Sequence, residues 1–222
     1  MIILVIKQHF LQKGEHMKKY LTEFIGTFFL VLTIGCTVLT RGVIPPLAIG
    51  SVLTAFIFAG GHISGAHYNP VVTLAAWFRG RCATNDVIPY IISQIAGALL
   101  AAVTVNYLKA GSVFAVINPE YMPTFLAEFL FTFALVYVIL NVATARETAG
   151  NSYYGLAIGL SLLAGAFAVG SISGAAFNPA VALALPVMGL LEWQHVVLYI
   201  LAQCAAGLAA AWVFLFTHPN DH

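Results

Sequence analysis

The chain has 222 residues, of which 61% are apolar and only 8% charged, whereas soluble domains carry roughly 25% charged and 45–50% apolar residues. This composition excludes an ordinary soluble domain and indicates a protein embedded in lipid. The formal net charge is +1, with no run of basic residues, so nucleic acid is not an expected partner. Spans of about 20 apolar residues with short loops use up the length, which leaves no room for a separate catalytic domain.

Six apolar segments long enough to span a bilayer follow one another, at about 20–39, 46–60, 87–108, 124–144, 153–169 and 195–216. Two shorter apolar segments, 69–78 and 178–189, cannot cross. A ten-residue helix rises about 15 Å, which is half of a hydrocarbon core of about 30 Å. The sequence therefore predicts an all-α membrane protein with six transmembrane helices and two re-entrant half-helices.

The basic residues predict the orientation of the chain. With the N-terminus inside, the cytoplasmic residues are Lys7, Lys13, Lys18, Lys19, Arg79, Arg81 and Arg146, and only Arg41 and Lys109 face out. This distribution follows the positive-inside rule, so we expect both termini in the cytoplasm and the protein in the plasma (inner) membrane. Residues 1–16 are expected to be an extension that is disordered or not native, because Met17 begins a natural flank of the first span.

An internal repeat is the strongest sign of how the chain is organised. Residues 61–70, GHISGAHYNP, match residues 170–179, GSISGAAFNP, at seven of ten positions. Each half then reads span, span, half-helix, span. An odd number of spans per half places the second half in the membrane the other way up, so the repeats are inverted. The expected boundaries are a first repeat at 17–110, a connecting loop at 111–123, a second repeat at 124–217 and a tail at 218–222.

Each half-helix begins with Asn-Pro, at Asn69-Pro70 and Asn178-Pro179. Asparagine caps the first amides of a helix, and proline is tolerated at the first helical position. Two helix N-termini, each carrying about half a positive charge, would meet near the midplane and disfavour cations there. We expect both asparagine amides to donate to a central water. A lone Asn-Pro is more often a surface turn, but two copies in matching contexts favour a pore.

The glycine-rich stretches before these motifs, residues 61–68 and 170–177, must run partway into the bilayer. Irregular backbone at that depth survives only when it is buried in protein or lines a wet cavity. These stretches are therefore expected to line the pore.

With these motifs, residues 17–217 resemble the aquaporin and aquaglyceroporin family, whose twin motif is Asn-Pro-Ala. The two copies here are Asn69-Pro70-Val71 and Asn178-Pro179-Ala180. The resemblance implies a homotetramer with one pore per subunit, which passes water and small neutral solutes through the lipid bilayer. It implies no cofactor and no metal.

The family has a narrower filter toward the outer mouth, and the resemblance assigns it to Ile49, Ala166, Ala175 and Val181. Water-selective members usually place an aromatic residue, a histidine, a small residue and an arginine there. Without the arginine, this chain resembles an atypical, bacterial-type member. The apolar set predicts a wide filter for glycerol, urea, ammonia, hydrogen peroxide or undissociated metalloid acids, and we hypothesise that proton exclusion is weaker.

Glu23 and Glu128 occupy matching places inside two spans, where an ionisable group is costly and therefore a functional suspect. They form either a proton relay or a brace that accepts hydrogen bonds from the re-entrant loops. The symmetry and the resemblance favour the brace. Gln94 and Gln203 also match across the repeats and are expected to satisfy buried loop groups.

His62 and His67 flank the first re-entrant stretch. They would tune conduction with pH or serve as fixed donors, and the resemblance implies that His67 faces the pore.

Three alternatives to an open channel remain. An ion-coupled secondary transporter also uses inverted repeats and half-helices, but its coupling-ion site would have to use the two glutamates. An enzyme is not expected, because no nucleophile and base and no metal-ligand cluster fall on a shared face. A closed relative would result if Val71 and the apolar filter left too few polar groups to keep the pore wet.

Overall fold

The computed structural model describes residues 2–40, 43–111 and 116–221, with only the backbone described for residues 2–13 and 15. The described residues form the helices α1 (Ile2–Val38), α2 (Pro45–Ser64), α3 (Pro70–Phe78), α4 (Thr84–Leu108), α5 (Tyr121–Ala143), α6 (Tyr154–Ser173), α7 (Pro179–Val187) and α8 (Val196–Thr217), with 3-10 turns η1 (Arg146–Thr148) and η2 (Trp193–His195). Strands are absent from this part of the chain, which holds only an isolated bridge between Ile117 and Leu191.

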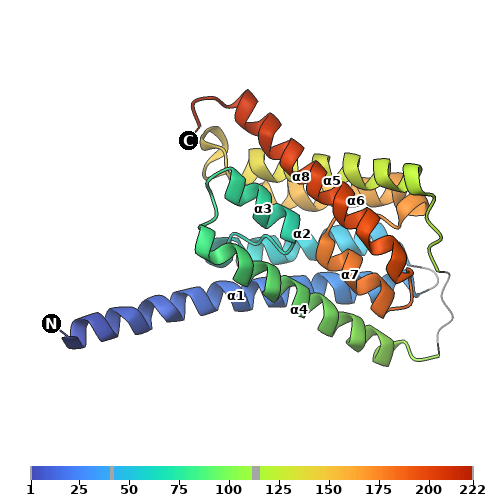
Figure 1. Ribbon diagram of the computed structural model, residues 1–222, viewed down its shortest axis with the longest axis horizontal. Helices are drawn as coiled ribbons and strands as arrows, with labels where there is room; N and C mark the ends of the chain where they lie inside the picture. Colours follow the sequence, from blue (N-terminus) through green and yellow to red (C-terminus); the bar gives the residue numbers. More distant parts are fainter. Residues whose placement is uncertain (1, 41–42, 112–115, 222) are drawn as a thin grey trace.

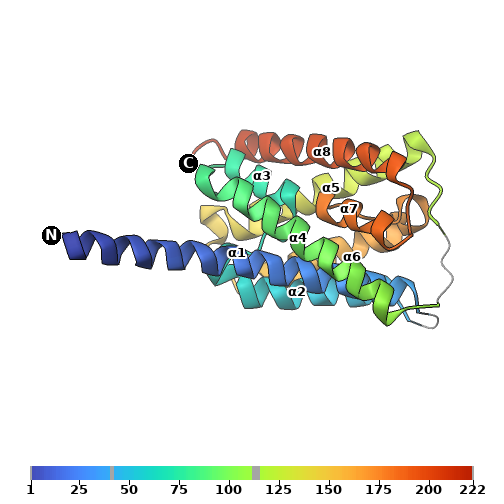
Figure 2. The same ribbon diagram turned by 60° about the horizontal axis from the view of Figure 1, so that its bottom comes forward.

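Six of the described helices are long and apolar enough to cross a membrane, namely α1 from His16 onward, α2, α4, α5, α6 and α8. They confirm the expected all-α architecture with six spans. Residues 2–16 continue α1 as a helix, which differs from the disordered extension that the sequence suggested. Figures 1 and 2 show the spans as one bundle with both chain termini at the same end, hereafter the termini end.

The basic residues divide between the two ends of the bundle largely as expected. Lys18 and Lys19 precede the apolar part of α1, while Arg79, Arg81 and Arg146 follow α3 and α5 at the termini end, and Lys109 follows α4 at the other end. Arg41 lies outside the described residues, and only the backbone is described at Lys7 and Lys13.

The two short helices enter the bundle from opposite ends, α3 from the termini end and α7 from the other (Figure 1). Both end in the same way. Gly80 and Gly189 adopt φ of +81° and +72°, and the next residue donates back to the carbonyl five residues earlier, from Arg81 to Ala76 and from Leu190 to Leu185. This is a left-handed C-terminal cap. It stops α7 at Val187, two residues before the predicted end of that segment.

Close packing between the two halves depends on glycine where α2 crosses α6. A Cβ on Gly50 would lie 2.8 Å from the carbonyl oxygen of Gly159, and a Cβ on Gly159 would lie 2.5 Å from the carbonyl oxygen of Gly50. Small residues let helix backbones approach this closely in membranes. The crossing therefore fixes the distance between the second helix of each half.

Candidate functional site

The two re-entrant loops, residues 65–69 and 174–178, have the same unusual backbone. Four residues other than glycine have positive φ: Ala66 (51°), Tyr68 (49°), Ala175 (55°) and Phe177 (49°). This region of φ is uncommon for residues with a side chain, and bulky ones are strained in it. Surrounding contacts must therefore hold the loops in place.

Glu23 on α1 holds the first loop. Its Oε1 accepts from the backbone N–H of His67 (2.9 Å) and from the hydroxyl of Ser64 (2.6 Å). Its Oε2 accepts from the N–H of Tyr68 (2.7 Å) and from Nε2 of Gln94 (2.8 Å). The carboxylate is fully buried, so these four donors replace the water that it has lost.

Glu128 on α5 repeats this arrangement for the second loop. Its Oε1 accepts from the N–H of Ala176 (2.9 Å) and the hydroxyl of Ser173 (2.7 Å). Its Oε2 accepts from the N–H of Phe177 (2.8 Å) and Nε2 of Gln203 (2.8 Å). Gln94 and Gln203, which we expected to satisfy buried loop groups, thus donate to the two carboxylates that hold the loops.

The two glutamates face the protein rather than the pore. Neither belongs to the described residues that line the central cavity, and both make the hydrogen bonds that a brace requires. A proton relay would need carboxylates that contact the conducted water. This geometry favours the brace over the relay.

Each half-helix begins with its asparagine as the N-cap. Oδ1 of Asn69 accepts from the N–H of Val71 (3.0 Å), and Oδ1 of Asn178 accepts from the N–H of Ala180 (2.9 Å). Pro70 and Pro179 occupy the first helical positions, where a missing N–H costs nothing. Each Asn-Pro pair therefore forms the start of a half-helix.

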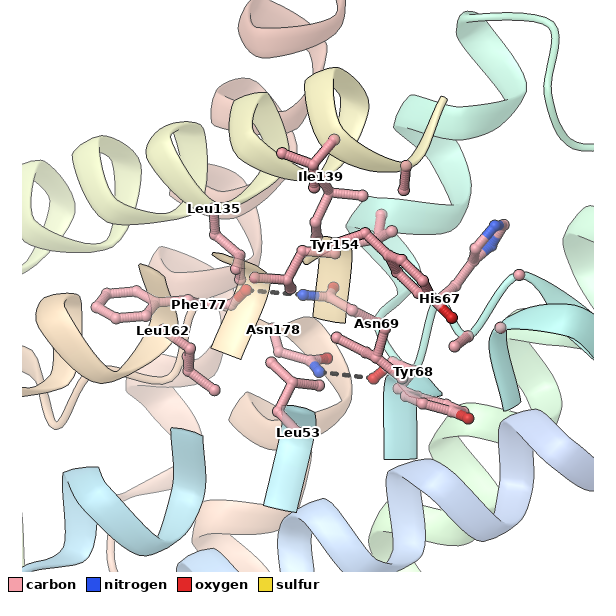
Figure 3. A pocket seen from close by; sticks show the side chains of 18 of the residues that line it. Leu53, His67, Tyr68, Asn69, Leu135, Ile139, Tyr154, Leu162, Phe177 and Asn178 are labelled. Atoms are coloured by element: carbon pink, nitrogen blue, oxygen red, sulfur yellow. Dashed lines mark hydrogen bonds between the residues drawn. The ribbon is translucent and has the colours of Figure 1, made fainter. Parts of the chain in front are cut away.

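The asparagine amides also tie the two loops together. Nδ2 of Asn69 donates to the carbonyl of Phe177 (2.9 Å), and Nδ2 of Asn178 donates to the carbonyl of Tyr68 (2.8 Å). Figure 3 shows the two side chains next to one another, with each bond crossing to the opposite loop. An amide NH₂ has two donors. One N–H of each asparagine is thus taken by the other loop, and the second is left for the cavity.

A cavity of about 810 Å³ runs along these loops. The spans contribute apolar residues spaced mostly four apart: Leu30, Ile34 and Val38 on α1, Ile49, Leu53 and Ile57 on α2, Leu135, Ile139 and Val142 on α5, and Ile158, Leu162 and Ala166 on α6. Several of them surround the asparagine pair in Figure 3. The cavity is therefore an apolar tube whose polar groups lie along the two loops and at its termini end.

The four expected filter residues, Ile49, Ala166, Ala175 and Val181, all line this cavity. They come from α2, α6, the second loop and α7. None of them carries a charge or a side-chain hydrogen-bonding group.

Both expected histidines also line the cavity. His62 is in the last turn of α2, and Nδ1 of His67 lies 3.1 Å from the hydroxyl of Thr73. Sequence reasoning missed further polar residues that line the termini end, which are Arg81, Thr144, Arg146, Thr148, Asn151 and Tyr154.

Val71, where the first motif departs from Asn-Pro-Ala, points away from the pore. It is 1% exposed, packs in a cluster with residues of α5 and α8, and does not belong to the described residues that line the cavity. The expectation that Val71 belongs to the pore and could dry it was therefore wrong. Of the motif residues, only the asparagines line the cavity.

Comparison with known proteins places this geometry in a family. The family model described as "Major intrinsic protein" matches residues 10–168 and 147–222. Nodulin-26 of Glycine max is 35% identical over 218 residues, which cover 92% of this chain and 79% of that protein. Probable aquaporin AqpM of Archaeoglobus fulgidus is 33% identical, covering 89% of this chain and 95% of that one. The X-ray structure of the aquaglyceroporin from Plasmodium falciparum superposes with a TM-score of 0.73 at 21% identity, over 92% of this chain and 96% of that chain.

Proposed function

This chain belongs to the major intrinsic protein family, and on that premise we propose that it is a passive channel for water and small uncharged solutes. The observation that carries the proposal is the pairing of Asn69 and Asn178 beside the cavity. Their remaining N–H groups, with the N-termini of α3 and α7, offer positive partial charge to a neutral dipolar molecule and repel a cation.

A channel accounts for the buried charges better than an ion-coupled transporter does. A transporter needs a site that binds a coupling ion, whereas all four carboxylate oxygens of Glu23 and Glu128 accept hydrogen bonds from the protein. The family is one of transport proteins rather than enzymes, and the chain is a channel and not a catalyst.

The lining of the filter supports passage of solutes larger than water. Val181 stands where the family usually has arginine, and Ala166 and Ala175 are small. These small, apolar side chains predict a wide constriction, which would lower the cost of admitting a bulkier neutral molecule such as glycerol, urea or an undissociated metalloid acid.

Orientation and assembly belong to the same proposal. The excess of lysine and arginine at the termini end supports placing both termini in the cytoplasm, with the protein in the plasma membrane. The family resemblance supports a homotetramer with one pore in each subunit.

Stopped-flow light scattering on proteoliposomes tests the solute range. The wild type should pass glycerol or urea as well as water. Val181→Arg should reduce the flux of the larger solutes by roughly tenfold, which corresponds to about 1.4 kcal/mol of added barrier. Water flux should fall less. The arginine both narrows the constriction and holds solute through its fixed donors.

Val181→Met is the matched control, because it adds length without charge. It should narrow the filter for large solutes but leave any proton leak unchanged, whereas Val181→Arg should lower that leak, measured with a pH-sensitive dye. Equal loss of water and glycerol in the arginine variant would contradict the filter assignment. Proton flux no greater than that of empty liposomes in the wild type would refute the weaker proton exclusion.

A further inference from the structure

The mouth of the cavity at the termini end carries charge, in contrast to the filter. Arg81 follows α3, and Arg146 begins the 3-10 turn between α5 and α6. Among the described residues that line the cavity, these two are the only ones that are arginine, lysine, aspartate or glutamate. Their side chains are 42% and 61% exposed, so they lie at the rim, where an entering solute passes.

Asp221, in the segment that follows α8, pairs with both of these arginines. Its Oδ1 lies 3.5 Å from Nη2 of Arg81 and 3.4 Å from Nε of Arg146, and its Oδ2 accepts from the backbone N–H of Arg146 at 2.9 Å. The aspartate side chain is only 2% exposed. A carboxylate this buried is fixed in place and can act as a point of attachment for exposed arginines.

Arg79 anchors the aspartate from the protein side. Its Nη2 lies 2.9 Å from Oδ1 of Asp221, and the same nitrogen donates to the carbonyl of Thr144 (3.3 Å). Its guanidinium stacks over the ring of Phe214 on α8 at 4.7 Å. The cluster therefore joins the end of α3, the α5–α6 connection and the segment after α8.

Among these four side chains positive charge predominates, because three guanidinium groups face one carboxylate. A cleft with apolar walls focuses the field of charges at its rim. A cation approaching from the termini end meets this field before it reaches the asparagine pair, whereas a neutral solute is unaffected.

We propose that Arg81 and Arg146 form a barrier to cations at the termini-end mouth, which compensates for the uncharged filter at the other end, and that Asp221 is the positioning residue that keeps them there. This inference rests on the proposed channel function. It locates the fixed positive charge of the conduction path at the opposite mouth from the filter.

The first test compares the wild type with Arg81→Gln/Arg146→Gln in proteoliposomes, while Arg79 is left intact because it is buried. Water and glycerol flux are measured by stopped-flow, and potassium and proton leak are measured under an imposed membrane potential. We expect neutral flux to stay within about twofold and cation leak to rise several-fold. The rise should be larger at low ionic strength, because the Debye length grows from about 8 Å at 0.15 M to about 30 Å at 0.01 M.

Lys18→Gln is the matched control, since it removes a positive charge at the same end from a residue that does not line the cavity. It should leave the leak unchanged. An unchanged leak in the double arginine variant with normal neutral flux would overturn the proposal, and so would a parallel rise of neutral flux and leak, which indicates a wider mouth. Absence of neutral flux in the wild type would instead contradict the channel function.

A second test isolates the positioning role of Asp221. Asp221→Asn raises the net charge of the cluster by one, so a purely electrostatic role predicts a smaller cation leak. Positioning predicts the opposite, because the arginines are released from the rim, and leak should approach that of the double arginine variant. Asp221→Glu should restore the wild-type leak. A decrease in leak with Asp221→Asn, or no rescue by glutamate, would refute the positioning role.

Discussion

At the scale of single residues, the valine of the first motif packs against a glycine in the core. A Cβ on Gly207 of α8 would collide with Cγ1 of Val71, so the glycine provides the room that the larger residue needs. Ala180, in the second motif, is fully buried. The departure from Asn-Pro-Ala therefore concerns packing between α3 and α8, at a residue that does not line the cavity.

Gly207→Ala should destabilise the protein by roughly 1–3 kcal/mol, the usual cost of overpacking a filled core. The measurement is the temperature at which the detergent-solubilised protein ceases to be monodisperse. Val71→Ala/Gly207→Ala should recover most of the loss, because the smaller side chain at 71 clears the collision. If the double variant were no more stable than Gly207→Ala, the two residues would not be coupled.

At the scale of elements, the half-helices could be predicted because repeated motifs mark where they begin. Asn-Pro has a defined chemistry at a helix start, and its second copy removed the ambiguity. The residues that line the cavity were harder to find. On α2 the stripe through Ile49, Leu53 and Ile57 faces the cavity, but Leu47 and Phe58 on the same helix are exposed on the outer surface, where lipid would cover them. Because both faces are apolar, composition cannot separate them.

The residues at the termini end were missed for a related reason. Arg81 and Arg146 lie next to spans, and a positive charge there is usually explained as an interfacial anchor. Only the folded chain brings them to one rim around Asp221.

The close crossing of α2 and α6 predicts how a substitution between the two helices affects stability. Gly159→Ala should push the two helices apart, because the new methyl group would meet the hydroxyl of Thr54 and the backbone of Gly50. We expect a loss of stability of roughly 1–3 kcal/mol, together with reduced solute flux. The stability is measured by the temperature at which the detergent-solubilised protein ceases to be monodisperse. Gly170→Ala on the same helix is the control, since nothing lies within 4 Å of its Cβ position. Similar losses in both variants would show that the crossing is not the cause.

At the scale of the whole molecule, the inverted arrangement followed from the odd number of spans in each half. Two halves with an odd number of spans give an even total, which requires both termini at one end, as observed (Figure 1). The helical continuation through residues 2–16 was not predicted, because the first natural flank of a span was sought at Met17. The connection between the halves runs through 112–115, which lie outside the described residues.

Asp221 makes the stability of the arginine cluster at the termini end sensitive to acid. Burial raises the pKa of its carboxyl. The backbone N–H of Arg146 and the charges of Arg79 and Arg81 lower the pKa by more, so it lies below its usual range. Because the folded pKa is depressed, the contribution to stability is complete well above the unfolded pKa of about 3.9 and is lost as pH falls through the folded value.

Thermal stability of wild type and Asp221→Asn should therefore differ at about pH 7, and the difference should shrink as the pH falls below about 3.9. Glu192→Gln, which removes an exposed acid near η2 at the other end, is the control and should show no such convergence. A constant difference between wild type and Asp221→Asn across this range would mean that the aspartate is not ionised in the cluster.

The exchanged bonds between Asn69 and the carbonyl of Phe177, and between Asn178 and the carbonyl of Tyr68, also bear on how the protein is made. When a ribosome has delivered only the first half to the bilayer, the tip of its half-helix has a donor and an acceptor that lack their protein partners. Those groups stay solvated until residues 177 and 178 arrive about a hundred residues later. Pore assembly is then a late, single event in synthesis, and neither half can complete the narrow centre alone.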